Sequence, residues 1–154
     1  MTRALKTLRP FEILLVDDNA GDIELAREAF ENIKVVHCLH VVRDGQSALD
    51  FLNQQGKYAS AIRPDLVLLD LNMPGKNGLE VLAAVKENKA LQDIPVIILT
   101  SSEAETDISQ SYHLHANAYI VKPVEMSQLI KVVGSLETFW LRAVMLPTQL
   151  KKTG

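Results

Sequence analysis

Short apolar runs alternate with amphipathic stretches along the whole chain. Five runs predict strands, at residues 12–17, 35–42, 65–70, 94–102 and 117–123. The stretches that follow them predict helices, at residues 20–33, 44–56, 77–89, 102–115 and 125–146. Five strands in strict alternation with five helices indicate an α/β fold in which helices cover both faces of a parallel sheet.

The runs also predict where each strand lies in the sheet. The first, third and fourth runs are apolar without alternation, as is typical of central strands that are buried on both faces. The second run contains His37 and His40, which favours a position at the edge. For the helix over 77–89, the residues expected to lie on one apolar face are Leu79, Leu82, Ala83 and the stem of Lys86.

Composition and charge narrow the class of protein. The chain has 154 residues, 47% of them apolar and 23% charged, which suits one globular domain with a sizeable core. A formal net charge of −3 argues against a nucleic-acid-binding surface. The chain has neither a signal-peptide pattern nor the roughly 20 consecutive apolar residues of a membrane span. With a single cysteine, Cys38, we expect a soluble, cytoplasmic protein without a membrane partner.

The predicted strands end on residues whose side chains can bind a metal ion or take part in a reaction. Ligands of open parallel sheets bind beyond the carboxyl ends of the strands, and Asp17, Asp18, Asp70, Thr100 and Lys122 stand there. Each of these residues alone has an ordinary structural explanation, but packing does not easily explain all of them at one edge. Three carboxylates would repel one another unless a hard cation such as Mg²⁺ joined them. An aspartate can also accept a phosphoryl group, whose charge the metal, Lys122 and Thr100 would balance.

Four segments resemble the receiver domains of two-component response regulators: "LLVDDNAGD", "LVLLDLNMPGKNGLEVL", "IPVIILTSS" and "NAYIVKPVE". The resemblance covers about residues 11 to 135. It implies a doubly wound, flavodoxin-like sheet of five parallel strands in the order 2-1-3-4-5. It also implies that Asp70 is phosphorylated by the phosphohistidine of a sensor histidine kinase.

The resemblance implies roles for the neighbouring residues as well. Mg²⁺ or Mn²⁺ would be held by Asp17, Asp18, Asp70 and the main-chain carbonyl of Asn72. Lys122 and Thr100 would stabilise the phosphoryl group, and Thr100 and Tyr119 would form the switch pair. The Lys122–Pro123 peptide bond would be cis. Asn77 stands where many family members have Asp, a departure that we do not expect to affect the chemistry.

The last predicted helix raises the question of a partner. We expect an arm over 1–10, a receiver domain over 11–146 that includes the extended last helix, and a tail over 147–154, so the signal would leave through a protein contact. Apolar residues cover roughly half of the circumference of this helix. They predict a homodimer surface formed by Val132, Leu136, Phe139, Trp140 and Ala143. Alternatively, the helix folds over the domain and buries this surface itself.

A narrower resemblance concerns the kinase. "ETFWL", the "LP" that follows and the loop "FLNQQGKYASAIRP" resemble the small response regulators of cyanobacterial and other bacterial phytochrome kinases, which tend to be dimeric. This resemblance implies a light-sensing histidine kinase as partner and leaves the downstream protein unidentified.

Three other readings stay open. An aspartyl-phosphate hydrolase would have D-x-D at the nucleophile strand, but Asn72 occupies the second position. A dinucleotide or flavin binder would have glycines in the first turn, where this chain has acids that repel phosphate. A dimeric scaffold with an inactive acid pocket would show no phosphorylation. We therefore expect a signalling protein and not a turnover enzyme.

Overall fold

The computed structural model describes residues 10–31, 36–73, 75–101 and 105–122, together with residues 131, 134 and 135. Its strands are β1 (Phe11–Val16), β2 (His37–Val42), β3 (Leu66–Leu69), β4 (Val96–Thr100) and β5 (Ala118–Val121). Its helices are α2 (Ala20–Phe30), α3 (Gly45–Leu52), α4 (Gly78–Glu87) and α5 (Glu105–His113), with a 3₁₀ turn, η1 (Gly56–Tyr58). Of the predicted last helix, only residues 131, 134 and 135 are described, and they are helical.

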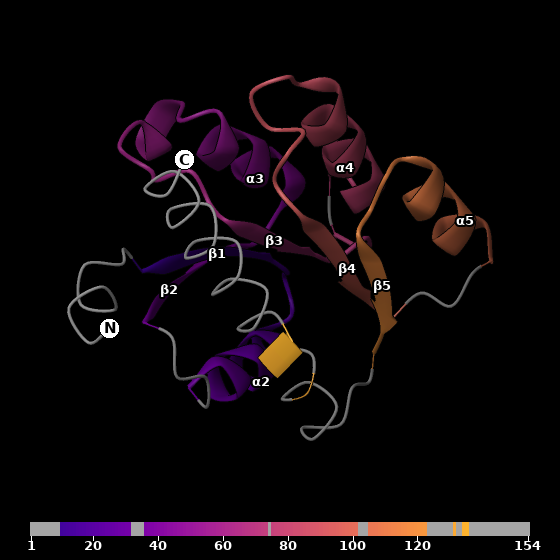
Figure 1. Ribbon diagram of the computed structural model, residues 1–154, viewed down its shortest axis with the longest axis horizontal. Helices are drawn as coiled ribbons and strands as arrows, with labels where there is room; N and C mark the ends of the chain where they lie inside the picture. The colour runs from indigo at the N-terminus through magenta and orange to yellow at the C-terminus, as the bar shows by residue number, and fades with distance from the viewer. Residues whose placement is uncertain are drawn as a thin grey trace, which may run out of the picture.

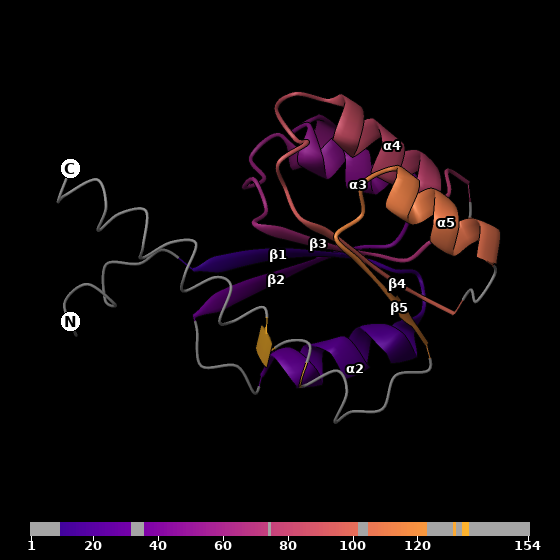
Figure 2. The ribbon, with the colours of Figure 1, turned by 45° about the vertical axis from the view of Figure 1, so that its right-hand side comes forward.

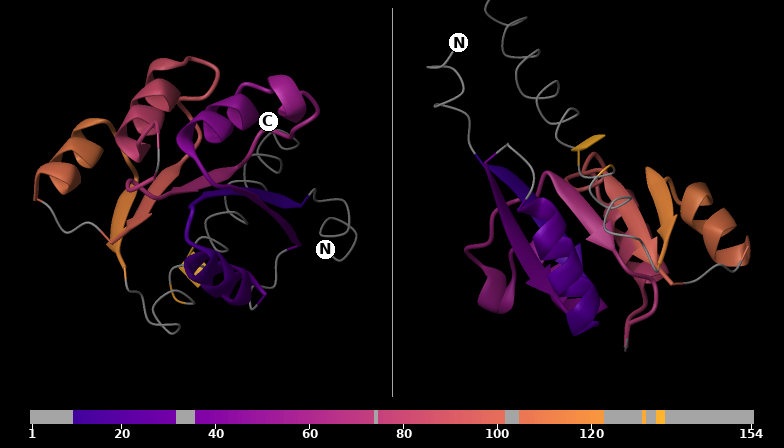
Figure 3. Two further views of the ribbon diagram at one scale, coloured as in Figure 1. Left: turned by 180° about the vertical axis from the view of Figure 1, so that it is seen from behind. Right: turned by 90° about the horizontal axis from the view of Figure 1, so that it is seen from below.

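The five strands form one parallel sheet in the order β2-β1-β3-β4-β5, which confirms the predicted fold. All five arrows point the same way (Figure 3), so their carboxyl ends share one edge of the sheet. Among the described helices, α2 covers one face and α3, α4 and α5 cover the other (Figures 1 and 2). β2 lies at an edge, as its polar residues predicted, and β1, β3 and β4 lie inside the sheet.

Alternate residues of the central strands feed two separate cores. On β1, Leu14 and Val16 pack with residues of α3 and α4, whereas Ile13 and Leu15 pack with residues of α2. Fully burying an aliphatic side chain of this size contributes about 1.5–3 kcal/mol. Because both faces are buried, these strands are fixed firmly, and so are the residues that follow them.

The apolar face predicted for α4 was partly wrong. Val81, Leu82 and Val85 are buried, whereas Leu79 and Ala83 are only half-buried. The helix begins at Gly78, which is pressed against the loop after β3, and this contact turns the row from Gly78 through Val81 and Leu82 to Val85 inward.

Lys86 is half-buried at the other end of α4. Its ammonium donates to the carbonyls of Gln92 and Ile94, each at 3.2 Å. Burial lowers the pKa of Lys86, and the charge of Asp93 opposes this shift. The charged end of Lys86 thus caps the loop before β4.

No helix within the described ranges is both long enough and apolar enough to cross a lipid bilayer.

Candidate functional site

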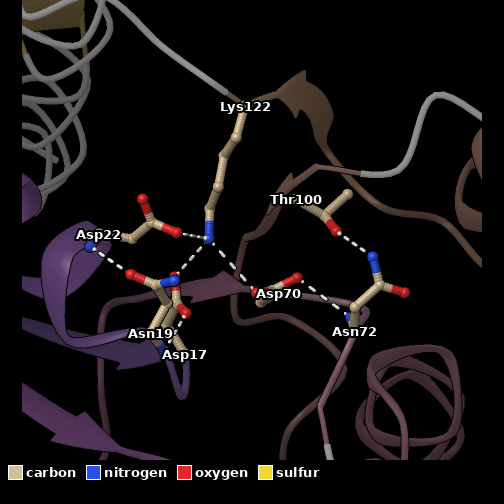
Figure 4. Close-up of polar contacts among 7 residues, drawn as sticks. All are labelled: Asp17, Asn19, Asp22, Asp70, Asn72, Thr100 and Lys122. Atoms are coloured by element: carbon tan, nitrogen blue, oxygen red, sulfur yellow. Dashed lines mark hydrogen bonds and ion pairs between the residues drawn. The ribbon is translucent and has the colours of Figure 1, made fainter.

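Three strand ends bring the predicted polar residues together. Asp17 follows β1, Asp70 follows β3 and Lys122 follows β5. Backbone hydrogen bonds extend the strand pairing to these residues: the N–H of Asp70 donates to Val16 at 2.9 Å, and that of Lys122 donates to Thr100 at 2.7 Å. The Lys122 ammonium lies 2.6 Å from Asp17 Oδ2 and 3.3 Å from Asp70 Oδ2 (Figure 4). Asp17, Asp70 and Lys122 therefore meet at one edge of the sheet.

Three carboxylates gather beside this ammonium. One oxygen from each of Asp17, Asp18 and Asp70 lies within 4.8 Å of the other two. Asp17 and Asp70 are buried, and Asp18 is exposed, which leaves the cluster open to solvent on one side. Oxygen donors of this kind suit a hard divalent cation that keeps some of its waters. The residues present therefore fit the divalent metal that the resemblance to receiver domains implies.

Burial and charge set the protonation of the site. Burial raises the pKa of Asp17, and the charge of Asp70 adds to this shift, although the hydrogen bonds from Lys122 and from the Asn19 N–H lower it. Burial lowers the pKa of Lys122, but its hydrogen bonds to Asp17 and Asp22 and the charges of Asp17 and Asp70 more than compensate, so the pKa is raised. Lys122 therefore stays an ammonium at neutral pH. Any further positive charge near Asp17 would stabilise the ionised form of its carboxylate.

The loops after β1 and β3 hold the two buried carboxylates in the same way. Asp17 Oδ1 accepts from the N–H of Asn19 at 3.0 Å, and Asp70 Oδ1 accepts from the N–H of Asn72 at 3.0 Å. In both cases a carboxylate bonds its own backbone two residues on, which is the Asx-turn pattern. Each carboxylate thus has one oxygen fixed by the loop and the other directed at Lys122.

The predicted switch residues lie on neighbouring strands. Thr100 is fully buried at the end of β4, and its hydroxyl accepts from the side-chain amide of Asn72 at 3.3 Å. Tyr119 is half-buried on β5, pairs with Ile98 in register and packs against the core on the α3 and α4 side. Asn72 thus connects the loop after Asp70 to the end of β4.

Some predicted residues cannot be located. Pro123 lies outside the described residues, and so does each residue of the predicted dimer surface, namely Val132, Leu136, Phe139, Trp140 and Ala143. The cis peptide bond and the dimer surface therefore stay predictions.

Sequence reasoning missed two residues at the site. Asp22, in the first turn of α2, accepts from Lys122 at 2.9 Å. Gly78, the first residue of α4, lies so close to the carbonyl of Asp70 and to Leu71 that a Cβ would clash with both. Asp22 stands three residues after the N-cap Asn19, and that spacing was the signal that could have placed its carboxylate near the end of β1. Nothing in the sequence pattern signalled the close contact of Gly78.

Asn77 also has a local structural role. Its side chain accepts from the N–H of Glu80 at 3.0 Å, and the Glu80 side chain accepts from the N–H of Asn77 at 3.3 Å. This capping box fixes the start of α4, so the departure from Asp keeps a good helix cap at this position.

Comparison with known proteins gives matches over most of the chain. Residues 13–134 match the response regulator receiver domain. The chain is 46% identical to the response regulator Rcp1 of Synechocystis sp. over 138 residues, which are 90% of this chain and 94% of that protein. The solved structure of the phosphorylated cyanobacterial phytochrome response regulator RcpA superposes with a TM-score of 0.80 and 48% identity, covering 89% of this chain and 98% of that one. The Mn²⁺-bound form of Rcp1 gives a TM-score of 0.79 and 46% identity, covering 88% and 98%.

Proposed function

Because the chain belongs to the response regulator receiver domain family of two-component systems, we propose that Asp70 accepts a phosphoryl group from a sensor histidine kinase. The placement of Asp70 carries the proposal. Its carboxylate stands at the end of a fully buried strand, with one oxygen fixed by Asn72 and the other 3.3 Å from the Lys122 ammonium. A buried strand has no structural need for such a group at its end.

Phosphoryl transfer to Asp70 is a nucleophilic displacement at phosphorus. A carboxylate oxygen of Asp70 attacks the phosphorus of the phosphohistidine, the P–N bond breaks, and the imidazole leaves. Water later attacks the same phosphorus, the acyl phosphate P–O bond breaks, and inorganic phosphate leaves as the carboxylate is restored. Lys122 and the hydroxyl of Thr100 would balance the charge of the phosphoryl oxygens, because they stand at the ends of the two strands beyond β3.

A divalent cation belongs to the same proposal. Asp17, Asp18, Asp70 and the main-chain carbonyl of Asn72 would hold Mg²⁺ or Mn²⁺, and the relative Rcp1 has a Mn²⁺-bound form. When bound, the ion supplies positive charge to a phosphoryl group. The chain itself supplies the orientation, since each of the buried carboxylates is bonded to its own loop.

The signal would pass from Asp70 to the surface through Thr100 and Tyr119. The side chain of Thr100 is buried beside the site, and its hydroxyl oxygen accepts from the Asn72 amide, so its O–H would donate to a phosphoryl oxygen on Asp70. Tyr119 on the neighbouring strand would turn inward behind it. The partner surface would lie on the receiver domain over 11–146, and we keep the homodimer through the last helix as a prediction.

The kinase is proposed from the relatives. RcpA, which is 48% identical, is a cyanobacterial phytochrome response regulator. A phytochrome-type histidine kinase is therefore the partner that we propose for this chain, with a downstream protein still to be identified.

The test is the intact mass of the protein after treatment with acetyl phosphate and Mg²⁺. We expect the wild type to gain one phosphoryl group, and we expect no gain in Asp70→Asn or without a divalent metal. A gain that persists in Asp70→Asn would show a different acceptor. If neither acetyl phosphate nor a phytochrome-type kinase labels the wild type, the chain is a phosphorylation-independent interaction module.

A further inference from the structure

A fourth carboxylate, that of Asp22, reaches the site from a helix and not from a strand end. Asp22 lies in the first turn of α2, where its N–H donates to the N-cap Asn19 at 2.9 Å. Its Oδ2 lies 2.9 Å from the Lys122 ammonium (Figure 4). Asp22 is not among the three carboxylates whose oxygens gather within 4.8 Å of one another. Its contact at the site is therefore with the lysine.

The three donors of the Lys122 ammonium match three acceptors. An ammonium has three N–H groups and no acceptor. Carboxylate oxygens lie around it at 2.6 Å (Asp17), 2.9 Å (Asp22) and 3.3 Å (Asp70). The contact with the proposed phosphoacceptor is the longest of the three. When a phosphoryl oxygen needs a donor from Lys122, one of the existing contacts must give way.

The three contacts differ in how easily they break. The side chains of Asp17 and Asp70 are 1% and 7% exposed, whereas that of Asp22 is 36% exposed. A buried carboxylate that loses its counter-ion pays a large desolvation penalty, but a half-exposed one is hydrated by water. As long as Asp70 is still a carboxylate, the Asp22 contact is therefore the one that breaks at the lowest free-energy cost.

We propose that Asp22 is a positioning residue that holds Lys122 on the α2 side of the site before phosphorylation and releases it to the phosphoryl group. This inference rests on the proposed function, because it assumes transfer to Asp70. By competing for the ammonium, Asp22 slows phosphorylation.

The first experiment measures the phosphorylation of Asp22→Asn by acetyl phosphate at saturating Mg²⁺. In this step a carboxylate oxygen of Asp70 attacks phosphorus, the P–O bond to the acetyl group breaks, and acetate leaves. We expect the rate to rise about two- to fivefold, the factor that a weak, half-exposed ion pair corresponds to. We expect Mg²⁺ affinity to change by less than about twofold, because Asp22 is not one of the three carboxylates that would hold the ion.

Glu24→Gln is the matched control for charge. Glu24 lies on the same helix, is 70% exposed and contacts Arg27 at 3.6 Å. Its substitution removes one negative charge from α2 without removing a contact of Lys122. We expect its phosphorylation rate to equal that of the wild type. An equal rise in Glu24→Gln and Asp22→Asn would reduce the effect to general electrostatics and overturn the proposal.

A double-mutant cycle with Lys122→Met separates positioning from a structural role. If Asp22 acts through Lys122, Asp22→Asn changes nothing in the Lys122→Met background. The same fold-change in both backgrounds, or an unchanged or slower rate in Asp22→Asn alone, overturns the inference. Thermal melts by circular dichroism check that each variant is folded. If the wild type is not phosphorylated, or Asp70→Asn still is, the proposed function itself fails, which is a different result from normal labelling that Asp22 does not affect.

Discussion

Single residues of the acid site oppose folding and support function at the same time. Asp17 is the clearest example, because its carboxylate is buried beside that of Asp70 and its pKa is raised by the loss of hydration despite the Lys122 contact. The charged form is therefore less favourable in the folded chain than in the unfolded chain. The site keeps a charge that stability alone would remove.

The pH dependence of stability follows from this shift. Because the pKa of Asp17 in the folded state lies above its ordinary value of 3.8, the folded protein binds more protons, and stability falls as pH rises from about 3.8 through the raised pKa. In EDTA at pH 7, we predict that Asp17→Asn has a higher free energy of unfolding than the wild type. The difference should shrink toward pH 3.8. Urea denaturation at a series of pH values measures it, and a less stable Asp17→Asn at pH 7 would show that the ion pair with Lys122 outweighs burial.

The placement of a site residue could be predicted from the sequence where that residue directly follows a strand. Asp17, Asp70 and Lys122 could be predicted to meet because parallel strands end at one edge, whatever their side chains contact. The role of Asp22 could not be predicted in that way. Its contact depends on how α2 is rotated after the N-cap Asn19, and hydrophobic periodicity does not resolve the direction of one half-exposed carboxylate.

At the scale of elements, the loop after β3 depends on its contact with the start of α4. The N–H of Gly78 donates to the carbonyl of Leu71 at 3.1 Å, and Gly78 leaves no room for a Cβ beside the carbonyl of Asp70. This contact sets both the loop that holds the Asp70 carboxylate and the face that α4 buries. The periodicity of the sequence predicted the helix but not its rotation, because the rotation depends on the close contact that Gly78 makes by having no side chain.

Gly78→Ala tests this contact. We predict a loss of about 1–3 kcal/mol in the free energy of unfolding, because the new methyl group would push apart the loop and the helix. Phosphorylation should also slow, since the backbone of Asp70 moves. Gly134→Ala is the control, because a Cβ there meets nothing within 4 Å and should stabilise its helix by about 0.5–1 kcal/mol. Equal stability changes in the two variants, measured by urea denaturation, would contradict the account.

At the scale of the whole molecule, the interior positions of three strands could be predicted from the apolar pattern, and the full order of the sheet from the resemblance to receiver domains, but the surfaces of the helices could not be predicted. Strands that are apolar on both faces can only lie inside the sheet, so the central positions of β1, β3 and β4 followed from composition. How far a helix face is covered depends on its neighbours. The predicted dimer surface around Phe139 and Trp140 is such a helix face, and it stays a prediction.

Metal binding should stabilise the molecule as a whole, because it joins residues that follow two different strands. We predict that Mg²⁺ at about 100 times its Kd adds about 2.7 kcal/mol to the free energy of unfolding of the wild type. Asp18→Asn should lose most of this gain, and because Asp18 is exposed, its stability in EDTA should stay close to that of the wild type. Thermal melts with and without Mg²⁺ measure both effects. An undiminished gain in Asp18→Asn would remove this residue from the metal site.

The most direct test of the central claim is to locate the phosphoryl group. Borohydride reduces an aspartyl phosphate to homoserine, so peptide mass spectrometry after labelling and reduction identifies the residue that was modified. We predict homoserine at position 70 in the wild type, and none there when the divalent metal is withheld. Homoserine at position 17, 18 or 22, with Asp70 intact, would contradict it.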